Sequence, residues 1–258
     1  MKVTLLRSAL ETPPGEEYQY LTTYVVNEHL AIDAGCLGLV GSPERQAGIR
    51  DVVLTHSHQD HIASLPVFLE NAYEARSDCV TIHGSRAVLD CLQRDVFNNR
   101  VWPDFIAISK RQPQAPFLKL ATLDAGRTVE IQGVRVTPIE LNHIVPTFGY
   151  VLEDASATVV IVSDTGPTDE IWSRANAARN LKAVFLEVTF PNEMSQIADV
   201  SKHLTPALFG AELGKLTRPA RVLTIHLKAR YADPIARQLA ALSLTNVELV
   251  QFGRVYEF

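Results

Sequence analysis

The feature that most constrains this chain of 258 residues is the segment Thr55-His56-Ser57-His58-Gln59-Asp60-His61, with three histidines and one aspartate in seven positions. The whole chain has eight histidines, so composition alone does not explain three of them here. Neutral imidazoles and carboxylates bind zinc and its first-row neighbours. The cluster follows the apolar run 51–54, and the HxHxDH spacing is far more restrictive than a lone HxH pair. The sequence therefore predicts a metal site at the end of a strand rather than a loop of solvated histidines.

Composition restricts the partners. The length suits one large domain with an ample core, and a net charge of −5 gives no electrostatic footprint for a polyanion, which argues against nucleic acid. No apolar run reaches the roughly 18 residues of a membrane span, and no apolar signal region precedes the first charge, so we expect a cytoplasmic protein without a membrane partner.

No CxxC pair is present, and reduced thiols rather than metal ligands are expected at Cys36, Cys79 and Cys91.

Strand-like runs recur along the chain, and in the second half they alternate with helix-like runs. In the first half we expect a hairpin over 24–33, strands over 51–55 and 80–82, and helices over 61–75 and 85–96, the second with Ser85 as its N-cap. The proline-containing segment 97–118 is expected to be irregular and to form a lid or an insertion. In the second half we expect strands over 119–123, 128–132, 134–140, 149–153, 158–163, 183–188, 220–225 and 247–251, with helices over 205–216 and 230–242. Two β-rich stretches, each followed by helices, predict an α/β (α+β) fold with two sheets packed face to face and helices outside, in a single domain over 1–258.

Three more ligand-type residues stand where apolar runs end. His143 follows the run 137–142, Asp164 follows 158–163, and His226 follows 222–225. Taken alone, Asp164 before Thr-Gly could be a turn residue, and either histidine could be a buried core side chain with all its hydrogen bonds made. The cluster at 55–61 favours the ligand interpretation for all three, because the ends of neighbouring strands present side chains to a shared cleft.

Taken together, these residues resemble the dinuclear members of the metallo-β-lactamase superfamily over most of the chain. The resemblance implies a four-layer αββα sandwich with two divalent metal ions at the sheet edges, taken as Zn²⁺ with Mn²⁺ or Fe²⁺ as alternatives. It also places Asp33 where that superfamily often has a carboxylate that orients a ligand histidine, and an ordinary strand-end turn is the alternative at this position. The implied ligands are His56, His58 and His143 for the first metal, Asp60, His61 and His226 for the second, and Asp164 as a bridge between both.

Segments 96–105, 185–193 and 201–206 narrow the resemblance to the class II 3′,5′-cyclic nucleotide phosphodiesterases. Gln59 stands where that family commonly has leucine, and Ala229 where it commonly has proline. Neither position is a ligand, so both bear on substrate preference more than on chemistry. The resemblance implies that a metal-bridging hydroxide cleaves the 3′ ester of a cyclic nucleotide, cAMP foremost, to give a nucleoside 5′-monophosphate. It also makes a homodimer plausible.

The departing 3′ oxygen needs a proton donor. His203 is the best unassigned candidate, since Glu187 could hold its imidazole in the donating form. The alternative for His203 is an ordinary residue ahead of the helix start at Thr205-Pro206. With the ligand Asp60, these two residues form the predicted catalytic group. Aromatic residues that could stack on a purine, although most aromatics are simply core, are Trp102, Phe105, Phe148 and Phe190.

Two other functions compete with a cyclic phosphodiesterase. The stretches 187–190 and 203–205 loosely resemble late motifs of tRNA 3′-processing endonucleases, although Gln59 departs from their HxHGDH form and no basic, glycine-rich arm is evident. The second alternative is a non-catalytic metal-binding module of the same fold, which a missing ligand would favour. All seven ligand positions carry ligand-type residues, which favours an enzyme.

Overall fold

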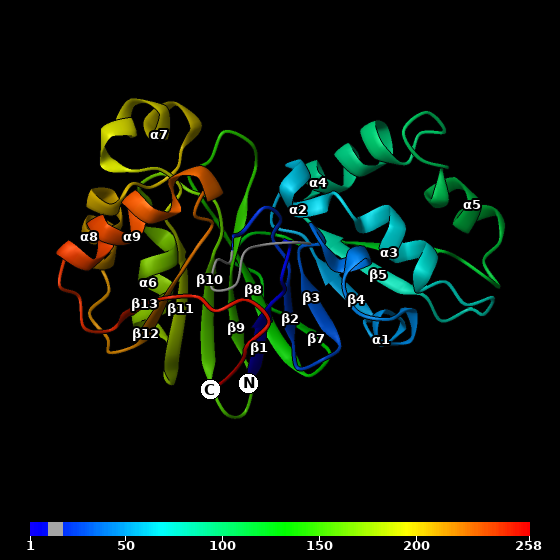
Figure 1. Ribbon diagram of the computed structural model, residues 1–258. Helices are drawn as coiled ribbons and strands as arrows, with labels where there is room; N and C mark the ends of the chain where they lie inside the picture. The colour runs from blue at the N-terminus through cyan, green and yellow to red at the C-terminus, as the bar shows by residue number, and fades with distance from the viewer. Residues whose placement is uncertain (10–17) are drawn as a thin grey trace.

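Two seven-stranded mixed sheets pack face to face, with helices on the outer face of each (Figure 1). The computed structural model describes residues 1–9 and 18–258. In spatial order, the first sheet contains β14 (Val255–Glu257), β1 (Lys2–Leu5), β2 (Tyr24–Val26), β3 (Leu30–Ile32), β4 (Asp51–Val53), β5 (Val80–Gly84) and β6 (Leu118–Thr122). The second contains β13 (Val247–Leu249), β12 (Arg221–Ile225), β11 (Leu181–Glu187), β10 (Thr158–Val162), β9 (Phe148–Glu153), β8 (Val134–Glu140) and β7 (Val129–Ile131). The predicted αββα sandwich is confirmed.

The helices divide between the two outer faces. Figure 1 shows α1–α5 beside the first sheet and α6–α9 beside the second. The helices of the first half are α1 (Pro43–Ala47), α2 (Gln59–Ile62), α3 (Leu65–Asn71), α4 (Arg86–Cys91) and α5 (Phe105–Arg111). Those of the second half are α6 (Glu170–Ala177), α7 (Ser195–Ser201), α8 (Pro206–Leu213) and α9 (Ala232–Ala241). None of the helices in the described ranges is long and apolar enough to cross a membrane.

The core between the sheets is built from alternating side chains of both inner faces. Tyr24 of β2 and Phe185 of β11 are buried there with ring centroids 5.5 Å apart in an edge-to-face arrangement. Two further apolar clusters lie beneath the outer helices, one for each sheet. Strands buried on both faces read as continuous apolar runs, which is why Thr158–Val162 is recognisable in the sequence.

Parallel strands bring their carboxyl ends to one edge of each sheet. Strands β3, β4, β5 and β6 are mutually parallel, as are β10, β11, β12 and β13. Residues that directly follow these strands therefore collect at one end of the sandwich. Figure 1 shows α2 at this end and the two chain termini at the opposite end.

The expected helix over 61–75 is two helices, α2 and α3. Ser64 separates them, because its hydroxyl donates to the carbonyl of Ala34 and accepts from the backbone N–H of Gly38. Pro66 is the second residue of α3, in the first turn, where its missing N–H is not needed. Helix α2 starts at Gln59, two residues earlier than expected, and carries Asp60 and His61 on one short turn.

The segment 97–118 is partly helical and not wholly irregular as expected. Asp104 caps α5 by accepting the backbone N–H of Ala107 at 2.8 Å. The ring of Phe105 stacks between Phe97 and Phe117, with centroids 5.6 and 4.2 Å away. Aromatic packing therefore ties this segment to the apolar cluster beneath the first sheet.

Ser85 caps α4 as predicted, accepting the backbone N–H of Val88 at 3.3 Å, and the chain continues from α4 into a π-helical turn over Leu92–Val96. Helices α1, α6 and α7 and strands β1 and β14 were not anticipated. The cysteines are free thiols, with Cys36 buried.

Candidate metal centre

The seven residues predicted as ligands converge at the end of the sandwich where the parallel strands stop. The 55–61 segment follows β4 and enters α2, and Asp164 and His226 follow β10 and β12. His143 lies in the loop between β8 and β9. Both sheets therefore supply side chains to one cluster.

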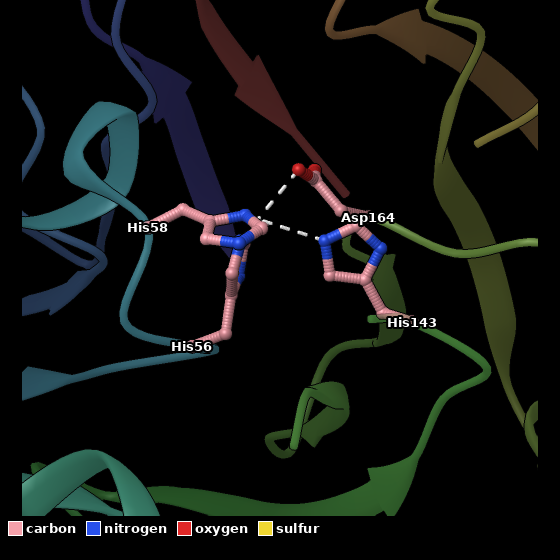
Figure 2. Close-up of side chains that lie close together, drawn as sticks. All are labelled: His56, His58, His143 and Asp164. Carbon is pink, nitrogen blue, oxygen red and sulfur yellow. Dashed lines mark hydrogen bonds and ion pairs between the residues drawn. The ribbon is translucent and has the colours of Figure 1, made fainter. Parts of the chain in front are cut away.

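A first group consists of His56, His58, His143 and Asp164, whose candidate ligand atoms all lie within 4.8 Å of one another. Figure 2 shows these four side chains pointing toward one another, His56 and His58 from the 55–61 segment and His143 and Asp164 from two other parts of the chain. The distances are 3.6 Å from His56 Nε2 to Asp164 Oδ2 and 3.3 Å from His58 Nδ1 to His143 Nε2. This spacing leaves room for one cation among the four.

A second group consists of Asp60, His61, Asp164 and His226, with ligand atoms again within 4.8 Å of one another. Asp164 Oδ2 lies 3.5 Å from His61 Nε2 and 3.4 Å from His226 Nε2. Asp60 Oδ2 lies 3.2 Å from the same His226 nitrogen. Asp164 thus belongs to both groups, the position that the resemblance implies for a bridging carboxylate.

Hydrogen bonds at Nδ1 turn the Nε2 atoms of several of these histidines toward the centre, whereas His58 presents its Nδ1. A carbonyl oxygen can only accept, so His143 Nδ1 donates to Lys202 O at 3.0 Å. His61 Nδ1 donates to Asp33 Oδ2 at 2.6 Å. The Nε2 atoms of His56 and His61 are buried and have no hydrogen-bond partner among the described residues. Unpaired buried nitrogens are costly, and lone pairs arranged in this way fit a divalent cation.

Two threonine hydroxyls fix further tautomers. Thr55 Oγ1 donates its single hydrogen to the Asp33 carboxylate at 2.8 Å. His56 Nδ1 lies 3.0 Å from Thr55 Oγ1 and must therefore donate to this hydroxyl oxygen. Thr189 Oγ1 likewise donates to Glu187 Oε2 at 2.6 Å. His226 Nδ1 lies 2.9 Å from the Thr189 oxygen and therefore donates to it. Neither threonine was identified from the sequence.

Strained backbone positions two of the site residues. Asp33 and His226 both have a φ of 62°, in the left-handed region that costs a non-glycine residue free energy. Asp33 directly follows β3, and its carboxylate holds His61, the contact that the resemblance implies for this position. The backbone N–H of His226 donates to Gln19 Oε1 at 2.7 Å. Gln19 carried no signal in the sequence, because the two residues are 207 positions apart.

Burial and mutual charge set the protonation of the group. Burial lowers the pKa of His56 well below its usual range, and the neighbouring His61 acts in the same direction. Burial opposes charge on His61 as well, but the carboxylates of Asp164 and Asp33 outweigh it and raise the pKa of His61 well above its ordinary value. Burial raises the pKa of Asp164, yet His226 and His61 outweigh it and hold that pKa well below the usual range. Asp164 is therefore ionised and His56 neutral, the forms that bind cations.

The structure brings the predicted pair of His203 and Glu187 together beside the second group. His203 Nδ1 lies 2.7 Å from Glu187 Oε1, and the His203 ring stacks on His226 with centroids 5.4 Å apart. Glu187 is buried and accepts from the backbone N–H groups of Thr165 and Leu204 at 2.9 and 3.1 Å. Burial lowers the pKa of His203, but the Glu187 carboxylate outweighs it and leaves that pKa raised. His203 is thus an imidazole that retains its proton to higher pH.

A cavity of about 620 Å³ opens beside His143. Its walls include the apolar side chains of Ile144 and Phe148 and the carboxylates of Asp124 and Glu140. The Phe190 ring lies 5.8 Å from the His203 ring, which in turn lies 5.1 Å from the His143 ring. Of the aromatics considered for base stacking, Phe148 and Phe190 border the site, whereas Phe105 packs within the first-sheet core.

Residues 34–227 match the beta-lactamase superfamily domain. The chain is 29% identical over 197 residues to 3′,5′-cyclic-nucleotide phosphodiesterase 1 of Saccharomyces cerevisiae, an alignment that covers 66% of this chain and 51% of that protein. It is 23% identical over 182 residues to a probable 3′,5′-cyclic-nucleotide phosphodiesterase of Yersinia pestis, covering 65% and 51%. The chain thus spans about half the length of these two relatives. It is also 22% identical over 247 residues to ribonuclease Z of Limosilactobacillus fermentum, covering 76% and 75%.

Solved structures share the fold over the whole chain. The unliganded crystal structure of yeast PDE1 superposes with a TM-score of 0.79 at 20% identity, covering 98% of both chains. The short form of human tRNase Z superposes with a TM-score of 0.68 at 16% identity, covering 100% of this chain and 99% of the other. These likenesses establish the architecture, and the chemistry has to be argued from the site.

Proposed function

The chain belongs to the beta-lactamase superfamily domain family, and from that premise we propose that it is a metal-dependent phosphodiesterase acting on 3′,5′-cyclic nucleotides, cAMP foremost. The products would be nucleoside 5′-monophosphates. The observation that carries the proposal is the position of Asp164, which lies 3.6, 3.5 and 3.4 Å from Nε2 atoms of His56, His61 and His226. The similarity to two proteins named cyclic-nucleotide phosphodiesterases supports the substrate class.

Two adjacent groups of four donors suit two divalent ions that share one carboxylate. The first ion would be held by His56, His58 and His143, and the second by Asp60, His61 and His226, with Asp164 common to both. Two such ions would activate a water molecule and neutralise the negative charge of the diester. The chain itself fixes the orientation of the metal-binding nitrogens. Asp33, Thr55 and Thr189 accept hydrogen bonds from the Nδ1 atoms of the ligand histidines, which are His61, His56 and His226 in that order.

His203 is proposed as the donor of a proton to the departing 3′ oxygen. Its Nδ1 is held by Glu187, which leaves Nε2 for the substrate, and the Glu187 carboxylate raises the pKa of His203, so the ring keeps its proton to higher pH than an ordinary imidazole does. The stacked contact with His226 places this ring directly beside the second donor group. These contacts support a role in protonating the leaving group.

The surroundings of the centre favour a small substrate over a nucleic acid. The cavity of about 620 Å³ beside His143 is of the size that small-molecule sites have. Asp124, Glu140 and Arg86 line it, so the cavity offers both acceptors and donors for hydrogen bonds to a base. The size and the polar lining of this cavity therefore support a mononucleotide as the substrate.

A tRNA 3′-processing endonuclease is the second candidate. The observation that favours it is the ribonuclease Z of Limosilactobacillus fermentum, which aligns over 76% of this chain and 75% of its own length. The alignment with ribonuclease Z thus covers similar shares of both proteins, whereas the alignments with the two cyclic-nucleotide phosphodiesterases cover 66% and 65% of this chain and 51% of each relative.

One comparison of substrates separates the candidates. Zinc-loaded and manganese-loaded protein is incubated with cAMP, cGMP and a precursor tRNA, and the products are resolved by chromatography and gel electrophoresis. We expect 5′-AMP from cAMP and an intact precursor tRNA. Cleavage of the precursor tRNA without turnover of either cyclic nucleotide would reverse the proposal.

A further inference from the structure

The side chain of Lys228 reaches the metal centre from the segment that follows β12. Its Nζ lies 3.6 Å from Oδ2 of Asp60, a proposed ligand of the second metal. The Lys228 side chain is 43% exposed, whereas that of Asp60 is 26% exposed. The ammonium group therefore stands at the mouth of the centre with one side open to solvent.

The backbone of Lys228 is held on several sides. Its N–H donates to Thr189 O at 3.5 Å, and its carbonyl accepts from the N–H of Tyr231 at 2.7 Å. A parallel bridge joins Lys228 to Gln19, the residue that also accepts the backbone N–H of His226. The backbone of Lys228 is thus fixed two residues after His226, and its side chain reaches Asp60 from there.

The contact with Asp60 leaves N–H donors of the Lys228 ammonium group available for a ligand. Asp60 Oδ2 already lies 3.2 Å from His226 Nε2, so the carboxylate has another partner. An ammonium has three donors, is strongly hydrated and binds phosphate oxygens as a point charge. A half-exposed lysine with donors to spare, beside a centre built for a phosphodiester, has the chemistry to bind the anion.

We propose that Lys228 binds a nonbridging phosphate oxygen of the substrate and thereby selects anionic phosphodiesters over neutral esters. This role rests on the proposed function and adds a substrate-binding residue to it. Lys228 approaches the second donor group, and the cavity beside His143 adjoins the first. A phosphate lying across both groups would therefore have the lysine on one side and room for its nucleoside on the other.

The test compares three variants. Lys228→Met removes the charge and keeps the aliphatic stem, and Lys228→Arg keeps the charge. Lys182→Met is the matched control, because it removes an exposed charge from β11 at the end of the strand far from Glu187. Two measurements are made on zinc-loaded protein. Calorimetry gives the Kd of inorganic phosphate, and steady-state kinetics with bis(p-nitrophenyl) phosphate gives KM and kcat at several salt concentrations.

In Lys228→Met we expect the phosphate Kd and the KM to rise on the order of tenfold, as one charge contact near 4 Å at a partly exposed site would give. The salt dependence of KM should weaken in the same variant, because salt screens exposed charges. Lys228→Arg should recover most of the binding, and Lys182→Met should match the unmodified protein. Zinc content should be equal in all four proteins.

Two results would overturn the proposal. One is an unchanged phosphate Kd in Lys228→Met, and the other is a loss of zinc that accounts for the weaker binding, which would make Lys228 only a support for Asp60. The phosphate measurement does not depend on cyclic nucleotides. Unmodified protein that binds phosphate through Lys228 but leaves cAMP intact would refute the proposed substrate and retain the lysine's role.

Discussion

Thr189 carries one hydroxyl hydrogen, yet three site residues approach its oxygen. Glu187 Oε2 lies 2.6 Å away, and Nδ1 atoms of His226 and His203 lie 2.9 and 3.2 Å away. Because the hydrogen goes to the carboxylate, His226 Nδ1 donates to this oxygen, whereas the single Nδ1 hydrogen of His203 goes to the nearer Glu187 Oε1 at 2.7 Å. One small side chain thereby couples a proposed metal ligand to the proposed proton donor.

Replacement of Glu187 by glutamine should move the alkaline limb of the pH–kcat profile to lower pH. The carboxylate raises the pKa of His203 despite burial, so its removal lets burial lower that pKa. The His203–Glu187 pair also stabilises the folded protein. This contribution to the free energy of unfolding is complete below the ordinary histidine pKa of about 6.5, and it is lost as the pH rises through the raised pKa of His203. Stopped assays of cyclic-nucleotide turnover between pH 5 and 10 give the profile.

His203→Ala supplies the control for that profile. Turnover should fall by about 10²–10⁴-fold, the usual contribution of a general acid, while the zinc content stays equal. The alkaline limb should also disappear. An alkaline limb that stays in place in Glu187→Gln would show that His203 is not the group that limits turnover at high pH.

Gly35→Ala should disturb the metal centre although residue 35 is not a ligand. A Cβ at this position would lie 2.1 Å from the carbonyl oxygen of Asp60 and 2.7 Å from the backbone nitrogen of Thr22. Backbone cannot yield as a side chain tip can, so α2 would have to shift and carry Asp60 and His61 with it. We expect a fall in both Tm and zinc affinity, measured by scanning calorimetry and competition with a chromophoric chelator.

The matched control is Gly84→Ala, where the added carbon would meet a Val88 methyl group at 3.4 Å, an ordinary contact. That variant should keep its zinc affinity. Equal zinc affinity in Gly35→Ala and the unmodified protein would mean that α2 tolerates the added methyl group.

Residue types at strand ends made the proposed ligands recognisable, because His143, Asp164 and His226 each interrupt an apolar pattern. The side chains behind the ligands were not recognisable. Thr55 and Thr189 are common strand residues, and the contact between Gln19 and His226 depends on tertiary structure alone. Glu187 and Thr189 do stand two residues apart, the spacing that puts side chains on one face of an extended chain, and this was a usable signal.

At the scale of elements, periodicity indicated the long buried strands and the amphipathic helices. It did not indicate the three-residue strand β14 or the short β1, since so few residues carry no distinguishable pattern. The boundary between α2 and α3 depends on hydrogen bonds of Ser64 to a distant loop, which local propensity does not encode. Asp104 did offer a cap signal for α5, although three nearby prolines favoured an irregular chain.

The Ser85 cap of α4 allows a test at this scale. Ser85→Ala removes the acceptor for the Val88 N–H and should lower the free energy of unfolding by about 1 kcal/mol, as N-cap losses do. Urea titration measures the change, and the zinc content should be unaffected. Ser85→Asp should restore the stability, and equal stability of the alanine variant would mean that solvent satisfies the N–H just as well.

The whole molecule depends on donors from both sheets. His56, His58, Asp60 and His61 come from the first half of the chain, and His143, Asp164 and His226 from the second. Ions bound by both halves would stabilise the folded state relative to the unfolded one by mass action. Chelation by EDTA should therefore lower Tm by roughly 5–10 °C, and added Zn²⁺ should restore it.

Asp164→Asn supplies the control for the chelation experiment. It removes the carboxylate common to both donor groups, so its Tm should respond little to EDTA and its activity should be lost along with the metal. A Tm of the unmodified protein that does not change on complete removal of zinc would contradict a role for the metals in joining the two halves.

The pairing of β14 with β1 also governs when this protein can fold. Val3 lies opposite Tyr256 in that pairing, so the first sheet is completed only by residues at the far end of the chain. Loop-closure entropy has to be overcome before such distant strands meet, which slows folding and exposes an unpaired strand edge in the meantime. On the ribosome, the histidines at 55–61 emerge well before His226 and β14 are synthesised. The nascent first half therefore presents metal-binding side chains and an open sheet edge together, a state in which a chaperone or early metal capture would have its greatest effect.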